Sequence, residues 1–232
     1  HTPIRRQRQM CIRDSGCSFT RYDTDTYADY IGKNYKEFYN YGNPGSGNAQ
    51  IATTLSEKIL EHDINKNDRV IVQWSSITRE DRYVKGSHSP KVCNWWPKGD
   101  VFNLNNSDFY TLEWHKDWVS MEHFTKITYA YIHLAYGLLR SKNIPFCMLT
   151  MLDILPPVYE RERMVDCHPR EVIRYSVNYH DILTRIQPSM KKSIFNNKWP
   201  NKHGDNGHPT ESQHIQYAKE HLSFLLDNTW PL

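Results

Sequence analysis

The chain has 232 residues, of which 38% are hydrophobic and 24% charged, so it is long and apolar enough for one globular domain and is not a disordered polymer. It contains no run of the roughly 20 apolar residues that a membrane-spanning helix needs, and we expect a soluble protein. Its five cysteines lack CxxC spacing, which indicates free thiols rather than a disulfide framework or a cysteine zinc site.

The net charge of +3 comes from residues 1–15, because the rest of the chain carries 25 basic and 25 acidic residues. The run from Arg5 to Ser15 resembles an in-frame translation of a common transposon-end sequencing adapter. We interpret residues 1–15 as an adapter-derived, non-native segment that stands in place of a first apolar strand. The alternative is a basic arm that binds nucleic acid or lipid. The segment has no helical or strand period, so we do not expect it to contain a structural element. It also lacks the apolar core of a signal peptide, which favours the cytoplasm.

Residues 16–232 are expected to form a single domain, because no long linker, low-complexity run or repeat interrupts them. Residues 50–62 have the apolar spacing of an amphipathic helix, and residues 68–74 form a β-branched run typical of a buried strand. From 75 to 117 the periodicity disappears among Trp, Asn, Ser, Pro and Gly residues. We interpret this segment as an irregular aromatic insertion.

The second half of the chain repeats the alternation of helices and strands. The pattern predicts helices at residues 118–142, 170–186 and 210–226, and a buried strand at residues 144–152. Thr210 and Gln213 have the T-x-x-Q spacing of a capping box at the start of the last helix. Strands that alternate with helices indicate an α/β fold, a three-layer α/β/α sandwich with a central parallel sheet.

The first candidate for chemistry is Ser18, in the segment Gly-Cys-Ser-Phe-Thr that begins at Gly16. This segment would follow the first strand, at the carboxyl edge of the sheet, where open α/β sheets bind their ligands. A serine in such a turn is a candidate nucleophile. Taken alone, the segment favours a serine that only caps a turn or helix.

The second candidate is the pair Asp205 and His208, immediately before the last helix. A carboxylate three residues before a histidine can orient the imidazole and stabilise its protonated form, as a base in nucleophilic catalysis requires. A polar loop that only shapes the start of the helix remains an alternative. Another is a metal site formed by this pair with His203 and His214.

The third candidate is the glycine-rich loop from Asn43 to Asn48, which leads into the first predicted helix. Backbone N–H groups in such a loop can point at an anion or at a developing oxyanion. The loop lacks the lysine of a phosphate-binding P-loop and has no GxGxxG spacing, so it does not favour nucleotide binding. A plain turn before a helix remains possible.

Together, the order and placement of these blocks resemble the SGNH (GDSL-like) hydrolase family. The resemblance implies that Ser18 is the nucleophile, that Gly45 contributes to an oxyanion hole, and that Asp205 with His208 completes a catalytic triad. It also implies a flavodoxin-like strand order and no metal or organic cofactor.

The chain departs from the family pattern after its second strand. The family has Gly-x-Asn-Asp there, whereas this chain has Trp74-Ser-Ser-Ile77 and no asparagine. We therefore expect the oxyanion hole to consist of the backbone N–H groups of Ser18 and Gly45, with Asn48 or Ser76 as substitute donors. Loss of one oxyanion donor costs on the order of 100-fold in rate.

These observations predict a serine esterase or deacylase that acts on small-molecule or carbohydrate O-acyl esters through an acyl-enzyme. Nucleic acid and membranes are not expected as partners. The alternative is a catalytically weak or inactive carbohydrate-binding module of the same fold, whose aromatic insertion would stack on sugars. The missing asparagine favours the module, and the presence of all three triad residues favours the enzyme.

Overall fold

The structure is a computed structural model that describes residues 11–83, 95–100, 111–154, 179–199 and 208–226. The strands are β1 (Cys11–Ser15), β2 (Glu37–Asn40), β3 (Arg69–Trp74), β4 (Arg79–Tyr83), β5 (Trp95–Asp100) and β6 (Phe146–Thr150). The helices are α1 (Tyr27–Gly32), α2 (Asn48–Glu61), α3 (Leu112–Trp118), α4 (Met121–Ser141), α6 (His180–Leu183), α7 (Met190–Asn196), α8 (Glu211–His221) and α9 (Ser223–Leu226).

Within the described residues, the central sheet has four parallel strands in the order β2-β1-β3-β6. Its interior strand β3 contains Val70, Ile71 and Val72, which are all buried because helices cover both faces of the sheet. The order agrees with the first four positions of the expected flavodoxin-like arrangement. The predicted α/β class with a parallel central sheet is confirmed.

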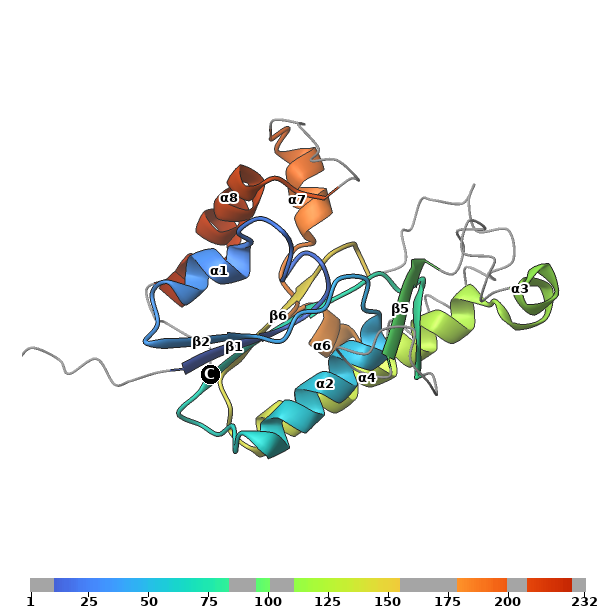
Figure 1. Ribbon diagram of the computed structural model, residues 1–232, viewed down its shortest axis with the longest axis horizontal. Coiled ribbons are helices and arrows are strands. Elements are labelled where there is room, and N and C mark those ends of the chain that lie inside the picture. The colour runs from blue at the N-terminus through green and yellow to red at the C-terminus, as the bar shows by residue number, and fades with distance from the viewer. Residues whose placement is uncertain (1–10, 84–94, 101–110, 155–178, 200–207, 227–232) are drawn as a thin grey trace, which may run out of the picture.

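Two helical layers enclose the sheet, as Figure 1 shows, with α1, α7 and α8 on one face and α2 and α4 on the other. The first layer packs on the sheet through a cluster that includes Ile12, Tyr27 and Tyr217. The second packs through a cluster that includes Ile51 and Leu139. The apolar core therefore lies on both sides of the sheet, and the strand ends remain available for a site.

Strand β1 corrects one expectation, since residues 1–15 were not expected to contain a structural element. Ile12 pairs with Phe38 on one side and with Arg69 on the other, so β1 lies between two parallel neighbours. Backbone pairing on both sides provides the strand although its side chains lack an apolar pattern, and even Asp14 is fully buried. The adapter origin of residues 1–15 stays a prediction.

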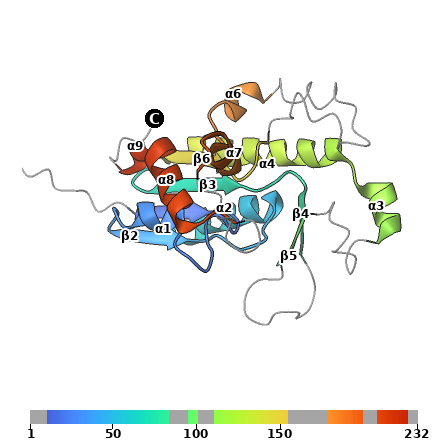
Figure 2. The ribbon, with the colours of Figure 1, turned by 90° about the horizontal axis from the view of Figure 1, so that it is seen from above.

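The segment from 75 to 117 is not wholly irregular, contrary to expectation. Strands β4 and β5 form an antiparallel pair, and Figure 2 shows this pair at one end of the molecule, apart from the main sheet. The sequence of β4, Arg79-Glu-Asp-Arg-Tyr83, has no apolar alternation that would have predicted a strand. Its pairing with β5 is therefore a tertiary effect.

The longer predicted elements agree with the structure within a few residues at each end. The last predicted helix is divided into α8 and α9 at Leu222, and the capping box of Thr210 with Gln213 is present. The predicted helix at 170–186 lies mostly outside the described residues, with α6 in its described part. Elements α1, β2 and α7 were not predicted. No helix in the described part is both long and apolar enough to cross a bilayer.

Candidate active site

Ser18 lies in a tight turn directly after β1, at the carboxyl edge of the sheet. The Cys17 carbonyl accepts hydrogen bonds from the N–H groups of Thr20 and Arg21, at 3.0 and 3.2 Å, and these bonds close the turn. Gly16 precedes it, and a Cβ there would lie 2.2 Å from Thr20 Oγ1. The turn thus requires glycine at 16 and holds Ser18 at the edge where such folds bind ligands.

His208 lies against Ser18 although 190 residues separate them in the chain. Its Nε2 atom is 2.9 Å from Ser18 Oγ, within the range of a hydrogen bond. His208 precedes by two residues the N-cap of α8, Thr210, whose side chain accepts a bond from Gln213 N–H. The capped start of α8 therefore fixes the backbone next to the imidazole.

Two aromatic rings contact the His208 imidazole. Tyr22 stacks on it with ring centroids 4.3 Å apart and planes 15° from parallel. Phe19 meets it edge-on at 5.7 Å. Tyr22 was not singled out in the sequence, because nothing in the local pattern shows that a tyrosine four residues after Ser18 meets a histidine near the end of the chain.

Of the other residues proposed for the second candidate site, the structure describes only His214. Asp205 and His203 lie outside the described residues. His214 is buried against Phe19 and Tyr27. Burial and the nearby His208 lower the pKa of His214 to about 4, so it is neutral at pH 7. Within the described ranges, no group of three His, Cys, Asp or Glu residues could hold a metal ion.

The glycine-rich loop lies beside the Ser18 turn. Asn43 N–H donates to the Gly16 carbonyl at 3.0 Å, and Ser46 N–H closes the loop onto Asn43 O at 3.1 Å. Gly45 has φ of 84°, a conformation that favours glycine. Among the described residues, the N–H groups of Gly45 and Ser18 form no hydrogen bond, so neither donor is already used within this part of the chain.

The two substitute donors are engaged elsewhere. The Asn48 amide accepts from Ser75 N–H at 2.8 Å and donates to Thr128 Oγ1 at 3.1 Å and to the carbonyl of Ser76 at 3.3 Å. The Ser76 hydroxyl bonds Thr78, through its Oγ1 at 2.6 Å and its N–H at 3.2 Å. Either side chain would have to give up these bonds to reach an oxyanion.

Positive charge lies near the Ser18 turn. The Lys191 ammonium is 5.9 Å from the centroid of the Phe19 ring. Burial and the charge of Arg79 lower the pKa of Lys191. Arg79 itself donates from Nη1 to the Ser46 carbonyl at 3.3 Å, in the glycine-rich loop. A developing negative charge on a ligand would be stabilised here.

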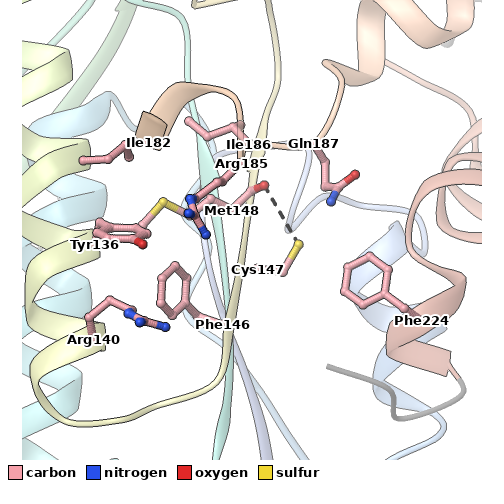
Figure 3. A pocket seen from close by; sticks show the side chains of 10 residues that line it. All are labelled: Tyr136, Arg140, Phe146, Cys147, Met148, Ile182, Arg185, Ile186, Gln187 and Phe224. Carbon is pink, nitrogen blue, oxygen red and sulfur yellow. Dashed lines mark hydrogen bonds between the residues drawn. The ribbon is translucent and has the colours of Figure 1, made fainter. Parts of the chain in front are cut away.

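A pocket of about 260 Å³ lies beside the edge strand β6, between α4 and α9 (Figure 3). Its walls are formed by Tyr136, Arg140, Phe146, Cys147, Met148, Ile182, Arg185, Ile186, Gln187 and Phe224. None of the candidate site residues that the structure describes lines it. The pocket is therefore distinct from the site that contains Ser18.

No protein-family model matches the chain, and no curated protein sequence matches it. Solved structures of hydrolases are similar to it in fold. The acetylxylan esterase Axe2 from Geobacillus stearothermophilus has a TM-score of 0.53 at 13% identity, with 91% of each chain covered. A G-D-S-L family lipolytic protein from Veillonella parvula has a TM-score of 0.49 at 14% identity, with 91% of this chain and 97% of that chain covered.

These comparisons establish a class of fold and no more. At 13% identity, the likeness to Axe2 shows that the two chains share a fold. That result agrees with the expected three-layer α/β arrangement. The roles of Ser18, Asp205 and His208 and the identity of the substrate depend on the site itself, because one fold can carry many activities.

Proposed function

We propose that the protein is a serine esterase or deacylase that hydrolyses carboxylic esters. The observation that carries this proposal is the 2.9 Å contact between Ser18 Oγ and His208 Nε2 at the carboxyl edge of the sheet. A hydroxyl within hydrogen-bond reach of an imidazole is the arrangement by which a histidine activates a serine. The esterase-type fold supports the same reaction class.

The reaction would proceed by acyl transfer. His208 Nε2 takes the proton of Ser18 as Oγ attacks the ester carbonyl, and the carbonyl oxygen becomes an oxyanion. The tetrahedral intermediate then expels the alcohol oxygen, which receives the proton from His208. Water attacks the acyl-enzyme with the same assistance and releases the acid. Asp205 would orient His208 through Nδ1, the ring nitrogen that does not face Ser18.

The oxyanion would be held by the backbone N–H groups of Ser18 and Gly45. Both groups are unbonded in the described structure, and the bond from Asn43 to Gly16 keeps their loops together. The engaged side chains of Asn48 and Ser76 provide no third donor in this conformation. We therefore expect the turnover of the protein to be slower than that of an esterase with three donors, by on the order of 100-fold.

Carbohydrate O-acyl esters are the substrate class that we favour. The structural neighbour Axe2 is an acetylxylan esterase, and the segment between β3 and α4 of this chain offers aromatic surface. Trp118 on α3 is 69% exposed, and Trp114 carries the Arg82 guanidinium 4.9 Å from its ring centroid. Exposed tryptophans can stack on the apolar faces of sugars.

Replacement of the nucleophile tests the proposal. Ser18→Ala is expected to lower kcat on a short-chain aryl acetate by at least about 1000-fold and to abolish labelling by a fluorophosphonate probe. Ser141→Ala, which removes an exposed hydroxyl at the end of α4, serves as the control and should keep both properties. Activity that survives in Ser18→Ala would remove the nucleophile assignment.

A second candidate is a binding module of the same fold without turnover. The engagement of both Asn48 and Ser76 favours it, because a site that only binds needs no oxyanion donors. The fluorophosphonate probe separates the two functions, since only an activated serine reacts with it. An unlabelled, folded protein that binds acetylated xylan would identify the module.

A further inference from the structure

The helix that follows the glycine-rich loop has no cap of its own. The N-cap residue of α2 is Gly47, which has no side chain to accept a hydrogen bond from the first N–H groups of the helix. The first N–H groups of a helix have no partner inside the helix, and a Ser, Thr, Asp or Asn at the N-cap normally supplies one. The start of α2 therefore depends on a partner from elsewhere.

Asp81 of β4 is that partner. Its Oδ1 accepts from Gly47 N–H at 2.6 Å, and its Oδ2 accepts from Gln50 N–H at 2.8 Å. These are the two N–H groups that a capping box satisfies, at the N-cap and three residues later. One carboxylate from a distant hairpin thus makes both bonds of a capping box.

Steric packing around Gly47 shows how closely Asp81 fits. A Cβ on Gly47 would lie 2.9 Å from Asp81 Oδ2 and 3.0 Å from the Arg79 carbonyl. Only glycine leaves room for the carboxylate at this distance. Arg79 adds a second link from the same strand through its bond to the Ser46 carbonyl. Strand β4 thus holds the loop at Ser46, Gly47 and Gln50.

We propose that Asp81 is a positioning residue that fixes the glycine-rich loop so that the Gly45 N–H points at the substrate oxyanion. This inference rests on the proposed esterase function. Gly45 lies two residues before Gly47, and the same loop is tied to the Ser18 turn by the bond from Asn43 N–H to the Gly16 carbonyl. Oxyanion donors act through preorganisation, so a loop that moves by a fraction of an ångström loses part of its effect.

The charge state of Asp81 agrees with this role at neutral pH. Burial raises the pKa of Asp81 to about 6, while the bonds from Gln50 and Gly47 and the charge of Arg79 favour ionisation. The other groups that face it are Glu80 on the same strand and Tyr131 on α4. Asp81 is therefore ionised at pH 7.5, and its hold on α2 weakens as the pH falls below 6.

The test compares Asp81→Asn with Glu80→Gln at pH 7.5. Asp81→Asn turns an amide NH₂ toward one backbone N–H, so one of the two bonds is lost. We expect kcat to fall about tenfold while KM stays nearly unchanged. Amide hydrogen exchange at Gly47 and Gln50 should become faster. Glu80→Gln removes one charge from the same strand, where Glu80 pairs with Arg82 at 3.5 Å, and should change neither property. A lower melting temperature with unchanged kcat would indicate a merely structural role and overturn the proposal.

Gly47→Ala is a second variant that keeps every functional group and displaces the carboxylate by steric contact. It should reproduce the loss in kcat. Unchanged amide exchange in both variants would show that Asp81 does not hold the loop. If the wild-type protein neither turns over esters nor reacts with the fluorophosphonate, the proposed function fails, and the positioning role with it. In that case, amide exchange still reports whether Asp81 caps α2.

Discussion

The ring of Tyr22 lies face to face with the imidazole of His208, with centroids 4.3 Å apart and planes 15° from parallel. The same imidazole bonds Ser18 through Nε2, so the stacked Tyr22 ring restricts rotation of the imidazole away from Ser18. An aromatic face also stabilises a nearby cation, and His208 would become a cation each time it accepts the serine proton. Tyr22 therefore both orients and stabilises the proposed base.

Two replacements of Tyr22 separate the effect of its ring on turnover from the effect of its phenol hydroxyl. Tyr22→Ala is expected to lower kcat about 2- to 12-fold, since such ring contacts are worth about 0.5–1.5 kcal/mol. Tyr22→Phe keeps the ring and should retain wild-type kcat. Steady-state kinetics on an aryl acetate provides the measurement. Equal losses in both variants would assign the effect to the hydroxyl rather than to stacking.

Asn48 is expected to contribute to stability more than to turnover. Its buried amide joins the start of α2 to the backbone after β3 and to Thr128 on α4. Asn48→Ala would leave Ser75 N–H without its acceptor, at a cost of about 2–3 kcal/mol in the free energy of unfolding. Urea denaturation measures this cost, and the exposed Asn67→Ala is the control. A large loss of kcat without loss of stability would instead make Asn48 an oxyanion donor.

The elements that could be predicted from the sequence are those whose apolar pattern is local. Strand β3 and helix α4 have such patterns, and both are present. Helix α1 has only six residues, too few for a period, although its capping box of Thr26 with Asp29 was a usable signal. Strand β4 could not be predicted, because it is stabilised by β5 and by the bond from Gly47 to Asp81, 34 residues away.

The residues of the candidate site also divide into those that the sequence predicted and those that only the fold brings into contact. The blocks that contain Ser18, Gly45 and His208 were found by their order along the chain, and the first and last of these residues are in hydrogen-bond contact. Tyr22 and Asp81 act across the fold, and their sequence neighbourhoods give no sign of it. Contacts between distant segments depend on topology, which local propensity does not encode.

His214 is expected to make the protein sensitive to acid. Its pKa is lowered to about 4 in the folded state, from an ordinary value near 6.5, so the unfolded chain binds a proton that the folded chain does not. The stability from this residue is complete above about pH 6.5 and is lost as the pH falls toward 4, by on the order of 3 kcal/mol. His214→Leu should abolish this loss.

The measurement is urea denaturation of both proteins at pH 4.5 and pH 7.5, with the exposed His133→Asn as the control. Asp14 and Asp81 change stability in the opposite direction over this range, but they are present in both proteins and cancel in the comparison. An identical pH dependence of the wild type and His214→Leu would contradict the prediction.

Asp14 is expected to lower stability as the pH rises, which is opposite to the effect of His214. Its replacement should therefore stabilise the protein. It is fully buried in β1, and neither carboxylate oxygen forms a hydrogen bond within the described residues. The nearby hydroxyls of Tyr27 and Thr20 bond each other, and Thr20 also bonds Gln73. Burial raises the pKa of Asp14 well above its ordinary value. Because the folded pKa is the higher one, stability falls as the pH rises from below 4 toward that pKa.

Asp14→Val places a β-branched apolar side chain at this position, and we expect a gain of about 1–3 kcal/mol in the free energy of unfolding at pH 8. The gain should shrink as the pH falls, because the raised pKa of Asp14 favours its neutral form in acid. Urea denaturation at pH 5 and pH 8 measures it, with the exposed Asp25→Val as the control. A loss of stability at both pH values would show that Asp14 is well accommodated. A gain would show that this position in the sheet suits an apolar residue. The interpretation that residues 1–15 stand in place of an apolar strand requires this result.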